Sequence, residues 1–125
     1  MEMRRVVVTG LGALTPIGND VEQYWQSLVN GVSGAALITN FDASQAKTQF
    51  ACEVKGFDAT KFFDRKEVRK YDKFSQYGIV AADQAVADCG VDFEKLNKER
   101  AGVIWASGIG GIITFQEEIT SFVRF

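Results

Sequence analysis

The sequence of 125 residues contains no histidine, and this absence excludes several kinds of active site. Ser-His-acid and Cys-His arrangements need an imidazole as the general base, and most zinc sites use histidine as a ligand. Neither arrangement can be completed from these residues. We therefore predict no catalytic residue, no metal site and no cofactor within this chain.

Cysteine is scarce, and long apolar runs are missing. Cys52 and Cys89 are too few for a disulfide framework and do not have CxxC spacing. Neither is expected to be a nucleophile, because free cysteine is among the residue types most often buried. No apolar run approaches the ~20 residues of a membrane span, and the valines at 6–8 are too few for a signal peptide. We expect a cytoplasmic protein without a membrane span.

What the sequence does contain is typical of a globular protein. Apolar residues make up 46% of the chain and charged residues 24%, which is an ordinary balance. The net charge of −2 gives no indication of a nucleic-acid partner. No repeat or low-complexity tract divides the sequence, so residues 1–125 are predicted to have no internal domain boundary.

Short β-branched runs alternate with helical patterns along the chain. Residues 5–9 and 102–106 are predicted to be strands buried on both faces, and residues 50–54 a half-exposed strand. Helices are predicted over 19–31 with Asn19 as N-cap, from Asp64 in the basic stretch 61–73, over 72–89, and around a Thr114/Glu117 capping box. This order predicts an α/β fold with helices layered on a mainly parallel sheet.

A glycine turn follows the first predicted strand, in the setting of a dinucleotide-binding fingerprint. Gly10 and Gly12 supply two of the three glycines that such a site requires, but Thr15 occupies the third position. The next helix also begins too late to present its amides to a phosphate at Gly10. The pattern therefore favours a tight turn between strand and helix over a nucleotide site.

The stretch 61–73 is locally basic, with six positive and three negative side chains. On a helix, Lys66, Arg69 and Lys70 would share one face because they stand at i, i+3 and i+4. Such a face suits an acidic protein or a phosphate. The pattern alone favours the other interpretation, a solvated helix surface.

A second glycine-rich loop, at 107–111, follows the predicted strand at 102–106. Ligands of α/β proteins bind at the carboxyl ends of parallel strands, and glycines let a ligand approach the backbone. Ile109 would be the one large side chain in this loop, between Gly108 and Gly110. The pattern fits a binding loop and a flexible connection equally well.

Taken together, these segments resemble the type II β-ketoacyl-acyl-carrier-protein synthases, which have the thiolase fold. The segments that carry the resemblance are 4–12, 15–19, 41–42, 65–70, 76–81 and 107–111. The resemblance implies a layered α/β/α fold that is incomplete in this chain. Residues 1–125 would be the amino-terminal part of its first thiolase-like half.

The resemblance also implies roles for two of the candidate sites. Lys66, Arg69 and Lys70 would dock the acidic helix of acyl carrier protein. Ile109, flanked by Gly108 and Gly110, would line the pocket for the acyl chain.

The reaction implied by the resemblance is a decarboxylating Claisen condensation, performed by a cysteine and two histidines. Those residues would lie beyond Phe125, so we expect this chain alone to be inactive and the complete acyltransferase to be a homodimer. The competing hypothesis is a stand-alone α/β module that binds a nucleotide or an acidic protein.

Overall fold

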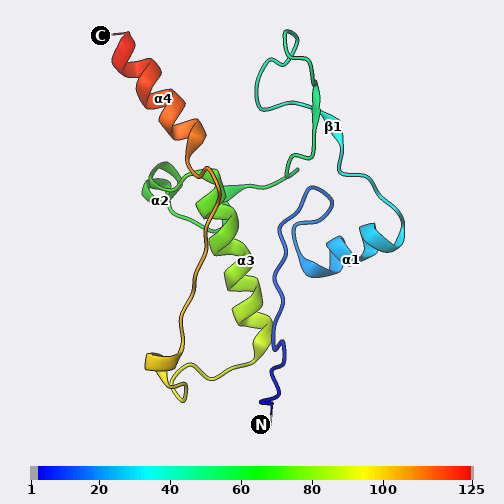
Figure 1. The fold of residues 1–125 in the computed structure, drawn as a ribbon, viewed down its shortest axis with the longest axis vertical. Coiled ribbons are helices and arrows are strands. Elements are labelled where there is room, and N and C mark those ends of the chain that lie inside the picture. The colour runs from blue at the N-terminus through cyan, green and yellow to red at the C-terminus, as the bar shows by residue number, and fades with distance from the viewer. Residues whose placement is uncertain (1–2, 125) are drawn as a thin grey trace.

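Helix α3 (Lys73–Cys89) is the centre of the structure, and two extended segments far apart in the sequence run along it (Figure 1). The computed structural model describes residues 3–124. The other elements are α1 (Val21–Val29), β1 (Ala36–Leu37), β2 (Phe50–Ala51), η1 (Ala59–Lys61), α2 (Arg65–Lys70), η2 (Lys98–Arg100) and α4 (Ile112–Val123).

The two central helices begin and end where local signals predict. Asp64 and Glu67 form a reciprocal capping box at the start of α2. Asp72 caps α3 by accepting a hydrogen bond from the amide of Phe74, and Gly90 ends the helix in the left-handed region at φ 61°. Both helix predictions are confirmed, because caps depend on residues that are close in sequence.

The caps of the outer helices differ from the prediction. α1 is capped by Asp20 rather than Asn19, whose side-chain amide instead donates to the carbonyl of Lys55 at 2.9 Å. α4 starts after Gly111 and has no side-chain cap. The predicted Thr114 capping box is therefore wrong, because the Thr114 hydroxyl donates to Asp72 in another part of the chain.

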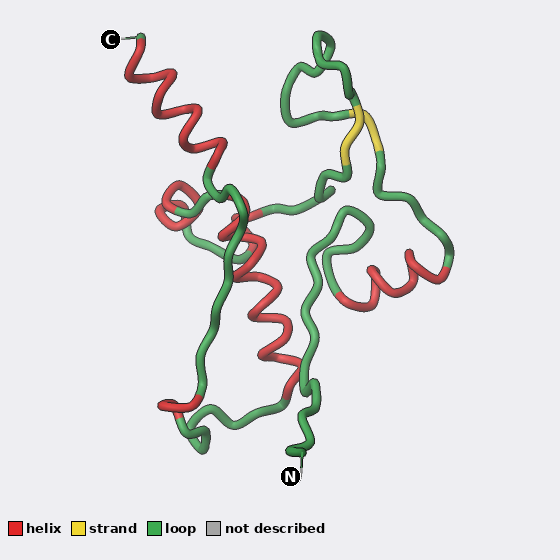
Figure 2. Tube along the Cα trace, viewed as in Figure 1, coloured by secondary structure: helices red, strands yellow, loops and turns green. Residues whose placement is uncertain are grey.

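The predicted parallel sheet does not form within residues 3–124. The strands there are β1 and β2, which pair antiparallel, and Figure 2 shows how little of the chain they occupy. Residues 5–9 and 102–106 are extended but unpaired and exposed, with Val6 89% and Ile104 98% exposed. A strand needs a neighbour to accept its backbone hydrogen bonds, and none of the described segments supplies one.

The strand predicted at 50–54 forms only at its first two residues, and its expected face is not covered. Phe50 and Cys52 are both exposed. Cys89 at the end of α3 is half-buried. The expectation of a buried thiol is therefore wrong for Cys52.

Glycines bring the opening segment onto α3. A Cβ on Gly10 or Gly12 would collide with the carbonyl oxygens of Ala85 or Ala81. The side chains of Gln84 and Asp88 then bind this segment, accepting hydrogen bonds from the amides of Ala13 at 3.0 Å and Leu11 at 2.9 Å. The first segment is thus fixed by close approach and by polar contacts to one helix.

Candidate functional site

The basic face of α2 comprises Lys66, Arg69 and Lys70, and all three side chains are exposed. The capping box fixes the start of this short helix, because the Asp64 carboxylate accepts hydrogen bonds from two backbone amides, at 2.7 and 2.8 Å. Glu67, the acidic residue within the helix, turns back to the amide of Asp64. The structure therefore places the three predicted cations together on one surface.

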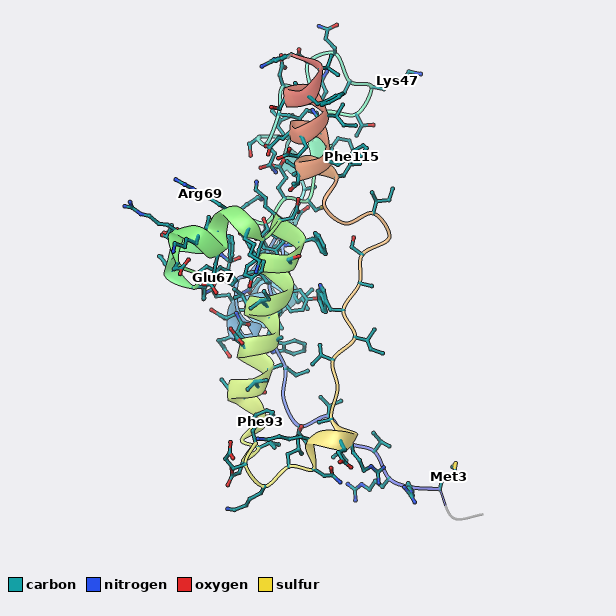
Figure 3. All side chains as sticks on the ribbon, turned by 90° about the vertical axis from the view of Figure 1, so that its left-hand side faces the viewer. Met3, Lys47, Glu67, Arg69, Phe93 and Phe115 are labelled. Atoms are coloured by element: carbon teal, nitrogen blue, oxygen red, sulfur yellow. The ribbon has the colours of Figure 1, made fainter. Side chains whose placement is uncertain are left out.

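No acidic side chain neutralises the basic face of α2 within the described part of the chain. The ion pairs found between residues 3 and 124 are Lys95–Asp92 and Lys98–Glu94, both in the segment between α3 and the end of η2. The Lys70 ammonium lies 5.5 Å from the centre of the Tyr71 ring, a cation–π contact. Figure 3 shows Arg69 extending away from α3. The charge is therefore available to an acidic partner.

The glycine loop at 107–111 connects the second extended segment to α4. Ile109 is 74% exposed and borders a cavity of about 310 Å³, with Cys52, Phe74 and Tyr77 on other walls. Gly110 lies against the Phe74 ring, where a Cβ would come within 2.8 Å of Cζ. Gly108 has open space around it. The loop thus presents Ile109 to a hollow whose walls are partly apolar.

A hydrogen bond joins the helix that follows this loop to the α2–α3 junction. The Thr114 hydroxyl of α4 donates to the Asp72 carboxylate at 2.6 Å, and Asp72 stands two residues after Lys70. This bond is the main cause that lowers the pKa of Asp72 below its ordinary value. Arg69 and Thr114 also border one larger cavity of about 650 Å³. The structure therefore brings the two predicted sites together at the amino-terminal end of α3.

A polar chain runs along the wall of the smaller cavity, and two of its members, Asn40 and Lys73, also border the larger one. Lys73 donates from Nζ to the side-chain oxygen of Asn40 at 3.2 Å, and the Asn40 amide donates to Glu53 at 2.7 Å. Hydrogen bonding, first from the Thr39 hydroxyl, lowers the pKa of Glu53. Burial, with a smaller contribution from the charge of Glu53, raises the pKa of Tyr77. These groups can bind polar atoms of a ligand, but they do not form a pair of nucleophile and base.

The described residues provide no metal site and no membrane span. No group of three or more potential metal-ligating side chains occurs between residues 3 and 124. None of the helices in this range is both long and apolar enough to cross a bilayer.

The glycines at 10–12 do not form a phosphate loop. Gly10 and Gly12 face the backbone of α3, so the space that they leave is already filled. One amide in the first turn of α1 is also occupied, because the Asp20 carboxylate accepts a hydrogen bond from the amide of Gln23 at 2.8 Å. A carboxylate at this position would repel a phosphate. The geometry therefore argues against the nucleotide-binding hypothesis.

The sequence interpretation missed three residues that organise the site: Asp72, Gln76 and Thr114. Gln76 is only 6% exposed and donates two hydrogen bonds to carbonyls at the end of α2. The sequence did contain a signal for a polar face on this helix. Positions 76, 80, 84 and 88 are four residues apart and share one face, and three of them are polar: Gln76, Gln84 and Asp88.

Comparison with known proteins identifies the family. Residues 3–122 match the family described as beta-ketoacyl synthase, N-terminal domain. The 3-oxoacyl-[acyl-carrier-protein] synthase 2 of Synechocystis sp. is 46% identical over 120 residues, which cover 96% of this chain and 29% of that protein. The synthase of the same name from Vibrio harveyi is 49% identical over 112 residues, or 90% of this chain and 27% of that protein.

A solved structure gives the fold. The ishigamide ketosynthase/chain length factor superposes with a TM-score of 0.66 at 38% identity, over 74% of this chain and 23% of that one. The expected thiolase-like α/β fold, incomplete in this chain, is thereby confirmed. The chain spans less than a third of the length of the relatives named above. This chain therefore belongs to the β-ketoacyl synthase family and lies within its amino-terminal domain.

Proposed function

We propose that this chain is part of a 3-oxoacyl-[acyl-carrier-protein] synthase, an acyltransferase that elongates fatty acids. The observation that carries the proposal is the family match over residues 3–122, with relatives of that name at 46–49% identity. A cysteine thiolate would take the acyl group from the thiol of its carrier. Loss of CO₂ from a malonyl thioester would generate a carbanion that attacks the acyl carbonyl and releases the thiolate. Because this chain has no histidine, we assign the reacting groups to residues outside it.

The direct test of this proposal is a condensation assay on the complete protein. Supplied with an acyl-carrier thioester and malonyl-carrier protein, it should release CO₂ and form a 3-oxoacyl thioester two carbons longer, detected by mass. Residues 1–125 alone should form none. Absence of product from the complete, folded protein would overturn the proposal and favour a non-catalytic module for an acidic partner.

We also propose that the basic face of α2 docks the acyl carrier protein. The support is its set of exposed cations without a carboxylate partner among residues 3–124. Unpaired surface charge of one sign accelerates encounter with an opposite charge and sets its orientation. Arg69 of this face borders the larger cavity, which shares Asn40 and Tyr77 with the cavity that Ile109 borders, so a docked carrier would be near the proposed acyl site.

Ile109 is proposed to form one wall of the acyl pocket, with Gly108 and Gly110 giving the chain access to the backbone. In the complete protein, Ile109→Phe should reduce elongation of long acyl chains at least several-fold relative to short ones, because the ring fills pocket volume. Ile109→Ala, which removes volume, should not impose this limit. The measurement is the ratio of kcat/KM for long and short acyl-carrier substrates. An unchanged ratio in Ile109→Phe would remove Ile109 from the pocket.

We further propose that the complete protein is a cytoplasmic homodimer. The support for a partner surface is the apolar stripe of α4, where Phe115 is 64% exposed and Phe122 81% exposed. Exposed apolar patches of this kind commonly mark protein interfaces. Light scattering on the complete protein should give twice the subunit mass, and a monomer would contradict this proposal.

A further inference from the structure

A buried amide on α3 holds the carboxyl end of α2. Gln76 is 6% exposed, and its Nε2 donates to the carbonyls of Val68 at 3.1 Å and Tyr71 at 2.8 Å. Both side-chain N–H groups are therefore used, and both are directed at α2 or the residue that follows it. Val68 lies between Lys66 and Arg69 in the sequence.

α2 depends on such external contacts for its direction. It has only six residues, and helices this short are marginal in water by themselves. Its last carbonyls have no partner within the helix and need donors from elsewhere. The capping box fixes the amino end of α2, and Gln76 supplies donors at the carboxyl end. The two ends of the basic helix are thus held by two separate devices.

We propose that Gln76 is a positioning residue for carrier binding: it sets the orientation of the basic face of α2 without touching the carrier. This inference rests on the proposed docking function of Lys66, Arg69 and Lys70. Without the two donated hydrogen bonds, the carboxyl end of α2 would fray and turn relative to α3. Arg69 and Lys70, which lie at that end, would then lose their fixed direction while remaining charged.

The test uses the complete protein with Gln76→Met, which keeps the side-chain length and removes both donors. The KM for acyl-carrier substrate should rise roughly three- to tenfold, with kcat nearly unchanged, and tenfold corresponds to 1.4 kcal/mol of lost binding. An acyl-pantetheine thioester, which lacks the carrier protein, should be used with much less change. Amide hydrogen exchange in α2 should be faster than in the wild type.

Gln84→Met is the matched control, because Gln84 is a half-buried glutamine on the same helix whose amide binds a different segment. It accepts from the amide of Ala13 and donates to the carbonyl of Asn19, so its loss should lower stability without changing the KM for the carrier substrate. If Gln76→Met does not fold, Gln76→Asn keeps the amide but retracts it by one methylene, and a smaller rise in KM is expected.

Arg69→Glu separates failure of this inference from failure of the docking proposal. If Arg69→Glu raises the carrier KM but neither Gln76 variant does, Gln76 is a structural residue and the inference is overturned. The inference is also overturned if Gln76→Met and Gln84→Met raise the KM for the carrier substrate equally. If Arg69→Glu has no effect, the docking surface itself is wrong, and the inference fails with it.

Discussion

At the residue scale, polar side chains of α3 make the contacts that hold distant segments in place. Gln84 bridges the amide of Ala13 and the carbonyl of Asn19, and Asp88 accepts from the amide of Leu11. Gln84 is half-buried and Asp88 is exposed, and the hydrogen bonds of both side chains help to fix where the opening segment lies. Small residues on the opening segment and on α3 permit their close approach. The contact is tightest where Gly12 lies against Ala81.

The close approach at Gly12 leads to a stability prediction. Gly12→Ala in the complete protein should lower the free energy of unfolding by about 1–3 kcal/mol, because the new methyl group must displace the segment from the Ala81 carbonyl. Gly102→Ala is the control, since none of the described residues other than its chain neighbours comes within 4 Å of its Cβ position. Urea denaturation measures both. Equal stability of the two variants would show that Gly12 is not in close contact.

At the element scale, Asp72 combines two tasks that sequence analysis can only partly anticipate. Its role as N-cap lies at the predicted start of α3, whereas its hydrogen bond to Thr114 joins residues 42 positions apart. Helices were predictable for this reason: their caps and apolar periodicity lie within a few residues. The absence of strands at 5–9 and 102–106 was not predictable, because strand pairing depends on a neighbour that the local sequence does not specify.

Removal of this cap should weaken the junction between α2 and α3. Asp72→Ala should lower the free energy of unfolding of the complete protein by about 0.5–2 kcal/mol, the usual range for an N-cap. Asp72→Asn keeps an oxygen acceptor and should lose less. Chemical denaturation at pH 7 gives the comparison. Equal losses in the two variants would contradict the role assigned to the side-chain acceptor.

The pH dependence of the same residue has a definite sign. The pKa of Asp72 is lowered from 3.8, chiefly by the Thr114 hydroxyl, so the ionised form is favoured in the folded state. Its contribution to stability is fully present above pH 3.8 and is lost as the pH falls through the lower, folded value. The stability difference between wild type and Thr114→Val should therefore shrink in acid. A difference that grows on acidification would show that the ionised carboxylate is not stabilised by Thr114.

At the scale of the whole molecule, the chain buries little of its own apolar surface. It exposes 10852 Å², whereas a compact monomer of this size would expose about 6,600 Å². The buried apolar residues among those described are Ala43, at 8% exposed, and Val80, at 1%. The position of the basic face of α2 was predictable from spacing and resemblance. Its proximity to the Ile109 loop was not, since that depends on how distant segments meet at α3.

This exposure predicts the behaviour of residues 1–125 in isolation. The polypeptide should be insoluble or molten, with ANS binding and weak near-ultraviolet circular dichroism from Trp25 and Trp105, which are 59% and 64% exposed. Thermal unfolding should be broad. A sharp, cooperative transition would instead indicate a self-standing module and would contradict this expectation.

The central claim, that the basic face of α2 docks an acidic carrier protein, is tested most directly by binding affinity at two salt concentrations. In the complete protein, reversing charge at Lys66, Arg69 and Lys70 to Glu should weaken binding at least tenfold at low salt. The loss should shrink in 1 M salt, where the screening length falls to about 3 Å. Reversal of three exposed cations near η2, Lys95, Lys98 and Arg100, makes the same change in net charge and should have little effect. Unchanged carrier affinity at low salt in the α2 variant would contradict the claim.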